Sequence, residues 1–262
     1  MPELPDLEVF KDNIFKRLTS KRLTRLVIFS SKITTPQVVL ESELLGRELQ
    51  SITRYGKELL FDFADKRIIS AHLMLNGKIS IVNNNATKNV IPQKVFALMF
   101  ENESVVFHDT GNIGTVIKYK PFVGNAPDAL GSNFTSEYFL NIARKNLLTN
   151  IKAFIIDQKI VKGIGNAYAD EILWTARVSP KSITGKIPEE VMIKLYNAIG
   201  TVLQDAVVSI KAISPDIISG EERSFLKVHT KFKKQTDTGF PIFVEMIATK
   251  KTYFTDEQVV YK

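Results

Sequence analysis

The chain of 262 residues contains no cysteine, which excludes disulfides and thiolate metal sites. Its only histidines are His72, His108 and His229, so we do not expect a histidine-rich metal site either. No run of 18 apolar residues occurs, and charged residues such as Glu3 and Asp6 interrupt the first ten positions. We therefore expect neither a membrane-spanning helix nor a signal peptide. Together these absences predict a soluble, cytoplasmic protein without a metal cofactor.

Acidic residues are fewer than basic ones, because the chain has 28 Asp and Glu but 35 Lys and Arg, which gives a net charge of +7. The imbalance is concentrated between residues 223 and 251, where the only acidic residues are Asp237 and Glu245. The basic residues of this stretch are Arg223, Lys227, Lys231, Lys233, Lys234, Lys250 and Lys251. Such a segment favours contact with phosphates, although a solvated basic surface would have the same composition.

The most informative segment is the first hexapeptide, Met-Pro-Glu-Leu-Pro-Asp. If Met1 is removed, Pro2 becomes a terminal secondary amine with the carboxylate of Glu3 beside it. An α-amine titrates near ~8, against ~10.4 for a lysine, so far more of it is unprotonated at neutral pH. Its attack on an aldehyde carbon gives an iminium cation that drives elimination, and Glu3 could transfer the protons. The alternative for Glu3 is an ordinary carboxylate at a helix start.

The first half of the chain is predicted to be β-rich after a single helix. Apolar residues recur at helical spacing over 6–18. Short β-rich runs follow at 23–30, 48–53, 57–63, 67–73, 78–82, 94–100, 104–108 and 114–119. This succession predicts a β-sandwich or flattened barrel over residues 1–120. Proline and glycine then mark 121–134 as a linker.

The second half is predicted to be helical and to end in a β-hairpin. Thr135 is a candidate N-cap for a helix over 136–145, with further helices over 150–158 and 167–176 and a long one beginning near Pro188. The runs 241–247 and 251–255 have the pattern of a hairpin. The fold class is therefore α+β with several domains, which are the N-terminal sandwich, the linker, a helical domain over 135–222 and a small β-hairpin domain over 223–262.

Several short motifs occur in a fixed order along the chain. They are Met1 to Pro5, His72-Leu73 with Gly77, His108-Asp109, and Gly163-Ile164-Gly165-Asn166. In this order the chain resembles the formamidopyrimidine-DNA glycosylase/endonuclease VIII family of DNA repair enzymes. The resemblance implies a β-sandwich, a helix–two-turn–helix domain and a finger. It also implies a monomeric base-excision repair enzyme, a DNA glycosylase with AP lyase activity on oxidised bases or abasic sites in double-stranded DNA.

The family's functional residues match positions in this chain. Pro2 matches the nucleophile, which forms a Schiff base and drives β- and δ-elimination, and Glu3 matches its acid/base partner. Lys57, which we group with the catalytic residues, matches a lysine that reaches the phosphates beside the lesion. His72 and Asn166 match further residues that bind DNA phosphates.

The family's finger commonly carries four zinc-binding cysteines, and this chain has none. The resemblance therefore implies a zincless hairpin held by packing, for which Phe240, Phe243, Val244, Tyr253 and Phe254 are candidates. The finger arginine that holds phosphates falls at Lys250, which keeps the charge but loses the bidentate fork.

A second departure concerns the residues that read the lesion. Gly111 and Ile113 stand where the family has an arginine and a phenylalanine that fill the space left by a flipped base. Asn112 replaces a phosphate-binding arginine, and Leu75 occupies the third insertion position. Leu75 and Ile113 can still act as wedges, whereas Gly111 cannot read the opposite base. Asp6 has two readings, as a contact of the flipped base or as a cap of the first helix.

Two alternatives to the repair enzyme remain open at this point. The first is a non-catalytic protein on the same scaffold that binds gapped or kinked DNA, because a retained Met1 would make the Pro2 nitrogen an amide. The second is an RNA-binding protein that uses the helical domain alone. The sequence does not reveal which damaged base is preferred.

Overall fold

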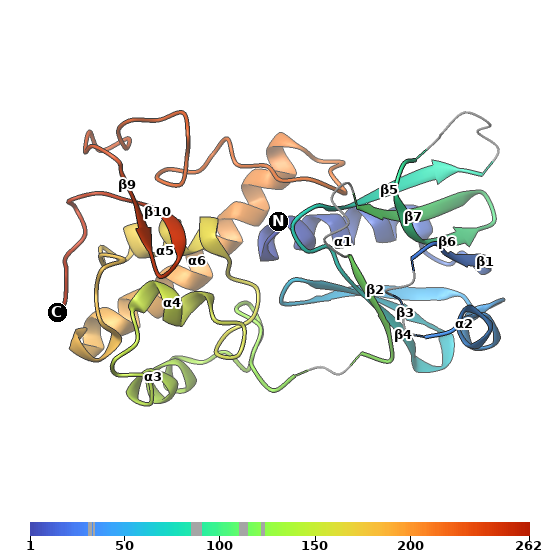
Figure 1. Cartoon of the computed structure of the whole chain (residues 1–262), viewed down its shortest axis with the longest axis horizontal. Coiled ribbons are helices and arrows are strands. Elements are labelled where there is room, and N and C mark those ends of the chain that lie inside the picture. Colours follow the sequence, from blue (N-terminus) through green and yellow to red (C-terminus); the bar gives the residue numbers. More distant parts are fainter. Residues whose placement is uncertain (31–32, 34, 85–90, 110–114, 122–123) are drawn as a thin grey trace. The chain divides into compact units, whose positions relative to one another are not determined.

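The computed structural model describes residues 1–30, 33, 35–84, 91–109, 115–121 and 124–262. These residues form two compact units (Figure 1). The first unit contains residues 1–124 and 210–221, and the second contains residues 125–209 and 222–262. Each unit has its own architecture.

The first unit is built from two four-stranded antiparallel sheets and helix α1 (Figure 1). One sheet has the order β1 (Leu23–Ile28), β6 (Lys94–Phe100), β7 (Glu103–Asp109), β5 (Gly77–Asn83). The other has the order β2 (Leu49–Tyr55), β3 (Glu58–Phe63), β4 (Arg67–His72), β8 (Val116–Tyr119). A short 3-10 turn, Ala64–Lys66, joins β3 to β4. The predicted β-sandwich is therefore confirmed.

Alternating burial along the strands builds the core of this sandwich. In β3 every second residue is buried, so that Phe61 and Phe63 point inward. Phe61 meets Phe107 of the other sheet edge to face, with ring centroids 5.8 Å apart, and Phe63 stacks on Phe100 at 6.5 Å. Such aromatic pairs across two sheets fix which faces meet.

Helix α1 (Leu4–Leu18) and helix α2 (Gln37–Leu44) complete the first unit. The expected helical stripe of α1 is buried, including Leu7, Phe10, Ile14 and Leu18, although the helix begins two residues earlier than predicted. Helix α2 was not predicted. It buries only Leu40 and Leu44, and two buried positions in eight residues give too weak a period to recognise.

The second unit contains four helices, α3 (Ser136–Arg144), α4 (Ile151–Ile156), α5 (Asn166–Thr175) and most of α6 (Glu189–Ile213), with a 3-10 turn at Thr184–Lys186. Thr135 caps α3 as predicted, because its hydroxyl accepts a hydrogen bond from the Tyr138 N–H. An aromatic cluster packs α3, α4 and α6 together. Its members are Phe134, Tyr138, Phe139, Phe154 and Tyr196.

By length and composition alone, α6 could cross a membrane, an outcome that the sequence analysis did not expect. The same test is passed by core helices of soluble proteins, so it is weak evidence. One side of α6 is buried within the protein. This buried side includes Met192, Leu195, Ala198, Ile199, Leu203, Ala206 and Ile210.

The chain closes with the antiparallel hairpin of β9 (Phe243–Ile247) and β10 (Lys250–Phe254). Its two-residue turn, Ala248-Thr249, has positive φ at both positions, which matches the twist of the flanking strands and places Lys250 directly after the turn. Tyr253 and Phe254 are buried as expected. Phe240 and Val244 are exposed, so the expectation that packing of their side chains holds the hairpin is wrong. Phe243 is also partly exposed, but its ring packs on that of Phe254 with the centroids 5.7 Å apart, as expected.

Candidate functional site

Pro2 and Glu3 are both buried, immediately before α1. Glu3 is the N-cap, and its side chain accepts a hydrogen bond from the backbone of Asp6. In return, the fully buried carboxylate of Asp6 accepts the Glu3 N–H at 2.8 Å. This reciprocal capping box fixes the chain entry into α1. It also shows that Asp6 caps the helix, which is one of the two readings left open by the sequence.

Met1 extends the chain beyond this cap. Its charged amino group forms an ion pair with the carboxylate of Glu221, which belongs to the same unit. With Met1 in place, the Pro2 nitrogen is an amide and has no nucleophilic lone pair. The chemistry predicted for Pro2 therefore requires removal of Met1. Glu221 was not predictable as a partner, because more than two hundred positions separate it from Met1.

Lys57 lies in the tight turn between β2 and β3, preceded by Gly56 with φ of +60°. Only 8% of the lysine is exposed. The neighbouring Arg54 donates to Glu8 of α1 at 2.8 Å, which ties this end of β2 to α1. The turn is thereby held against the same helix that Glu3 caps.

His72 ends β4 and pairs with Glu58 of β3. Its Nδ1 accepts the backbone N–H of Met74 at 3.0 Å, so the proton of the neutral ring resides on Nε2. Burial lowers the pKa of His72, the charges of Lys57 and Lys118 lower it further, and Glu58 opposes them. The ring is consequently neutral at pH 7 and presents an N–H donor close to Lys57.

The turn after His72 displays Leu75, which is 60% exposed. Met74 adopts a left-handed φ of +52°, and the Gly77 N–H closes the turn on the Leu73 carbonyl at 2.8 Å. A Cβ on Gly77 would lie 2.2 Å from that carbonyl oxygen and 2.3 Å from the Thr115 hydroxyl oxygen. Only glycine fits there, and this explains its place in the motif.

The other residues predicted to read the lesion, Gly111, Asn112 and Ile113, lie outside the described residues. The adjoining His108 and Asp109 are buried at the end of β7. His108 Nε2 lies 2.9 Å from the Ser80 hydroxyl, and Asp109 accepts the Thr115 N–H at 3.0 Å. Burial, with Lys78, lowers the pKa of His108, while Asp109 opposes the shift. These two motif residues therefore anchor the strand end within the sandwich.

In the second unit, the Gly163–Asn166 turn leads directly into α5. Gly163 has φ of +106°, and its N–H donates to the Gln158 side chain, which also donates to the Ile164 carbonyl. Asn166 is the first residue of α5, and its Nδ2 donates to the backbone carbonyl of Lys251 at 2.9 Å. The structure thus brings Asn166 to the hairpin, beside the exposed Lys250.

Two carboxylates of α5 fasten the following segments. Glu171 accepts the backbone N–H groups of residues 227, 228 and 229 at 2.7–3.0 Å, which is a structural role. Burial raises its pKa, against the hydrogen bonds from those backbone groups. Asp170 accepts from Lys152, His229 and the Tyr253 N–H. His229 is therefore engaged within the helical unit.

Lys152 was missed by sequence reasoning. It is fully buried and donates to Asp170 and to the Thr252 hydroxyl, both at 2.7 Å. A signal did exist, because a lysine that interrupts the apolar run Ile151–Ile156 must find a partner if that run is buried. Nothing in the sequence identified that partner.

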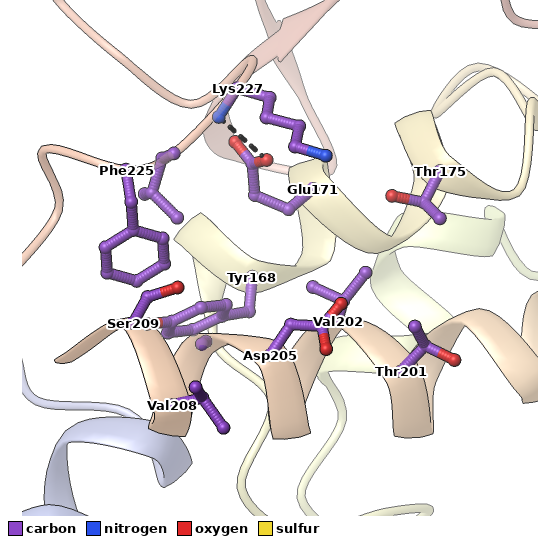
Figure 2. A pocket seen from close by; sticks show the side chains of 12 residues that line it. Tyr168, Glu171, Thr175, Thr201, Val202, Asp205, Val208, Ser209, Phe225 and Lys227 are labelled. Carbon is purple, nitrogen blue, oxygen red and sulfur yellow. Dashed lines mark hydrogen bonds between the residues drawn. The ribbon is translucent and has the colours of Figure 1, made fainter. Parts of the chain in front are cut away.

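A pocket of about 540 Å³ lies in the second unit, between α5, α6 and residues 225–227 (Figure 2). Tyr168, Val202 and Phe225 contribute apolar surface, whereas Asp205 and Glu171 contribute carboxylates. Figure 2 shows the Glu171 carboxylate turned toward the backbone of Lys227, so its oxygens are already occupied by hydrogen bonds. None of the predicted catalytic or DNA-binding residues that the structure describes lines this pocket.

Comparison with known proteins covers both units. The family described as "Formamidopyrimidine-DNA glycosylase N-terminal domain" matches residues 1–116, and the "Formamidopyrimidine-DNA glycosylase H2TH domain" matches residues 125–216. A formamidopyrimidine-DNA glycosylase of Carboxydothermus hydrogenoformans is 34% identical over 205 residues, covering 78% of this chain and 76% of that protein. One from Lactococcus lactis is 29% identical and covers 97% of both chains.

Solved structures agree with this fold. A complex between Lactococcus lactis Fpg and DNA containing an abasic site has a TM-score of 0.85 and 23% identity, covering 98% of this chain and 99% of that one. A complex of LlFpg with THF-DNA and an inhibitor has a TM-score of 0.86 and 24% identity, covering 98% and 100%. Together with the two family matches, these findings show that the chain belongs to the formamidopyrimidine-DNA glycosylase family.

Proposed function

We propose that this protein is a base-excision repair enzyme, a DNA glycosylase with AP lyase activity that acts on oxidised bases or abasic sites in double-stranded DNA. The observation that carries the proposal is the Pro2-Glu3 pair, fixed at the start of α1 in a chain that contains both family domains. The relatives named above are DNA glycosylases, and the structural relatives include complexes with abasic-site DNA.

The reaction would begin with the Pro2 nitrogen once Met1 has been removed. Its lone pair attacks C1′ of the damaged nucleotide, and the base departs with the electrons of the glycosidic bond. Protonation of the ring oxygen by Glu3 opens the sugar and leaves an iminium cation on Pro2. Loss of a proton from C2′ then expels the 3′ phosphate, and a second elimination expels the 5′ phosphate. Water finally hydrolyses the Schiff base and releases Pro2.

Lys57 and His72 would hold the backbone beside the reacting sugar. Lys57 supplies a positive charge on a turn that is braced against α1 through Arg54 and Glu8. His72 supplies a neutral Nε2–H donor, since its Nδ1 is occupied by Met74. A charge and a directed donor on neighbouring strand ends suit a phosphodiester, because phosphate contacts position the duplex without reading sequence.

The helical domain, proposed over residues 135–222, and the hairpin domain, over 223–262, would supply the remaining phosphate contacts. Asn166 stands at the N-terminus of α5, where backbone N–H groups and the helix dipole favour an anion. One amide hydrogen of Asn166 is used by Lys251, which leaves the second for a phosphate oxygen. Lys250 adds a charge on the adjoining turn.

Opening of the duplex would rely on Leu75, which is presented on a turn that Gly77 holds tightly. An apolar side chain inserted into the base stack offsets part of the cost of flipping. We propose Ile113 as a second wedge and Asn112 as a backbone contact, both outside the described residues. Asp6 contributes by holding the Glu3 backbone N–H.

We further propose that the protein is a monomer, because both family domains lie in a single chain. We propose that it acts in the cytoplasm on nucleoid DNA.

The competing proposal is a non-catalytic binder of distorted DNA. It is favoured by one observation, the ion pair of the Met1 amino group with Glu221, which would stabilise the unprocessed terminus. Such a protein would bind gapped or kinked DNA in a salt-sensitive way without cutting it.

Borohydride trapping separates the two proposals. Protein with Met1 removed is incubated with abasic duplex DNA and sodium borohydride. The enzyme proposal predicts a covalent adduct that the Pro2→Gly variant fails to form, whereas Lys16→Ala, at the far end of α1, forms it normally. Absence of an adduct with fully processed protein, together with retained binding to abasic duplex, would overturn the enzyme proposal in favour of the binder.

A further inference from the structure

The zinc that the family resemblance implies does not fit the tail of this chain. There is no cysteine, and no group of three or more His, Cys, Asp or Glu among the described residues could hold a metal ion. The turn before β9, the segment after β10 and the end of α5 meet at Glu257. There the Trp174 indole N–H and the Arg177 guanidinium both donate to the Glu257 carboxylate. Two N–H donors, one of them cationic, disfavour a bound cation.

The carboxylate of Glu257 occupies this meeting point. Its Oε2 accepts the Trp174 indole N–H at 2.8 Å and the Thr255 hydroxyl at 3.1 Å. Its Oε1 accepts the Thr238 hydroxyl at 2.9 Å and lies 2.6 Å from Nη1 of Arg177. Only 8% of the glutamate side chain is exposed. The Thr236 hydroxyl adds a longer contact to Oε2 at 3.5 Å. One carboxylate thus meets donors from five residues, which is near its full accepting capacity.

These donors come from three separate segments of the second unit. Thr238 lies in the turn before β9, Thr255 directly follows β10, and Trp174 lies in the last turn of α5 with Arg177 two residues beyond its end. The 255–258 turn is itself closed on the helical domain, because the Gln258 side chain accepts the Thr255 N–H and donates to the Val178 carbonyl, both at 2.9 Å. Glu257 therefore links the segment before β9 and the segment after β10 to the C-terminal end of α5.

We infer that Glu257 is a positioning residue, whose carboxylate takes over the fastening role of a metal and holds the Lys250 hairpin on α5. The opposite end of α5 shows why this matters. There Asn166 contacts the backbone of Lys251, so that a shift of the hairpin along α5 would separate the two proposed phosphate ligands. The inference rests on the proposed function only where its test uses DNA.

Arg177 supports the inference independently. It has a φ of +58°, a left-handed conformation that usually selects glycine after a helix end. Its guanidinium stacks 4.9 Å from the Trp174 ring while it pairs with Glu257. An arginine in this disfavoured conformation is explained by the contacts that its side chain makes.

The environment of Glu257 keeps it charged. Burial would raise its pKa, but hydrogen bonds from Trp174, Thr238 and Thr255 and the charge of Arg177 outweigh burial, and the net pKa is below the ordinary 4.5. Lys227, 5.9 Å from the Trp174 ring, adds a second positive charge nearby. The exposed Asp237 and Asp256 of the two turns are the neighbouring acids. The fastening is therefore complete at neutral pH and is lost as the pH falls through the lowered pKa.

The single tryptophan of the chain makes this inference directly testable. In the 15N-labelled full-length protein, the one indole N–H resonance reports the Trp174–Glu257 hydrogen bond. We expect it to hold its position from pH 8 down to below 4.5 in the wild type. The isosteric Glu257→Gln variant should shift it at every pH and speed hydrogen exchange of β9 and β10 at least tenfold.

Two control variants and one chelator experiment keep the test specific. Glu245→Gln removes an exposed carboxylate of the same hairpin, which pairs with Lys181, and should leave the indole resonance and the exchange unchanged. Lys250→Ala should weaken binding to an abasic-analogue duplex without moving the resonance. Glu257→Gln should do both, with about tenfold weaker binding, and Glu257→Asp should restore part of each. EDTA should change nothing in the wild type.

The inference is overturned if the Glu257→Gln variant has the same indole resonance position and the same hydrogen exchange of the hairpin as the wild type. Loss of the wild-type resonance upon EDTA treatment would also overturn it. If Glu257→Gln loosens the hairpin while the wild-type protein binds no DNA, the fastening role stands and the proposed function fails. The two failures are therefore distinguishable.

Discussion

His72 of the first unit and Glu257 of the second both have a lowered pKa, but their hydrogen-bonding groups are used differently. In the first unit, burial lowers the pKa of His72 and leaves a neutral ring whose proton resides on Nε2, at the end of β4. In the second unit, Glu257 also has a lowered pKa, but here hydrogen bonds and Arg177 keep the group charged. The first arrangement leaves a donor for the proposed phosphate contact, whereas the hydrogen bonds of the second are made within the protein.

This difference explains how a chain without cysteine keeps its hairpin in place. Asp170, Glu171 and Glu257 each accept several hydrogen bonds from segments that are distant in sequence. In the first unit the aromatic core of the sandwich does the corresponding work, with pairs such as Phe61 and Phe107. Internal ionic fastening is therefore expected to be more important in the second unit than in the first.

The strongest test of this contrast is removal of the fully buried Lys152. Lys152→Met leaves Asp170 buried with one ion-pair partner missing, which typically costs ~3–5 kcal/mol of unfolding free energy. The partly exposed Lys181→Met is the matched control and should cost under ~1 kcal/mol. Chemical denaturation of both variants measures the difference. Equal stability of the two would show that the second unit does not depend on its buried charges.

A steric change tests the first unit. Gly77→Ala would push a Cβ into the Leu73 carbonyl and the Thr115 hydroxyl, at an expected cost on the order of 2–3 kcal/mol. Gly200→Ala is the control, because it meets open space in α6 and should stabilise by ~0.5–1 kcal/mol. Thermal unfolding compares them. An unperturbed Gly77→Ala variant would mean that the turn carrying Leu75 is not held tightly.

The proposed phosphate contact of Lys57 gives a smaller effect. Lys57→Met should weaken binding to an abasic-analogue duplex about tenfold, or ~1.4 kcal/mol. The slope of log K against log salt concentration should become shallower by about 0.9 if one phosphate contact is lost. Fluorescence anisotropy across a salt series measures both quantities. An unchanged slope, with Lys16→Met as the reference, would remove Lys57 from the DNA contacts.

The smallest expected effect concerns the pH dependence of His72. Because its folded pKa lies below the ordinary 6.5, the unfolded chain takes up a proton first as the pH falls, so stability decreases below pH 6.5 until the folded ring also protonates. His72→Gln keeps a neutral donor and should flatten this part of the stability profile. Urea unfolding at several pH values between 5 and 7.5 provides the measurement, and an identical slope in the variant would contradict the assignment.

Periodic features were predictable from the sequence, and contacts between distant residues were not. The stripe of Leu7, Phe10 and Ile14 predicted α1, and Thr135 predicted the start of α3, because both depend on local spacing. The family motifs likewise singled out Pro2, Lys57 and Asn166, whose roles stay predictions. The start of α1 at Leu4 was missed, since its capping box uses Glu3 in place of the usual serine or threonine.

The fastening of the hairpin was not predictable. The expected apolar packing included Phe240 and Val244, but both side chains are exposed. Glu257 is a polar residue in a short turn and has no local signal in the sequence. Its role appears only when Trp174 and Thr238 are brought to it by the fold. Lys152 is the intermediate case, because its apolar neighbours signalled burial but its partner Asp170 lay 18 positions away.

The central claim is that the Pro2 nitrogen is the nucleophile, and mass spectrometry of the trapped complex tests it most directly. The protein is purified from its natural source, trapped on abasic duplex DNA with borohydride and digested, and the modified peptide is sequenced. We predict a peptide that begins at Pro2, lacks Met1 and carries the sugar remnant on the proline nitrogen. A remnant on a lysine, or intact Met1 throughout the natural protein, would contradict the claim.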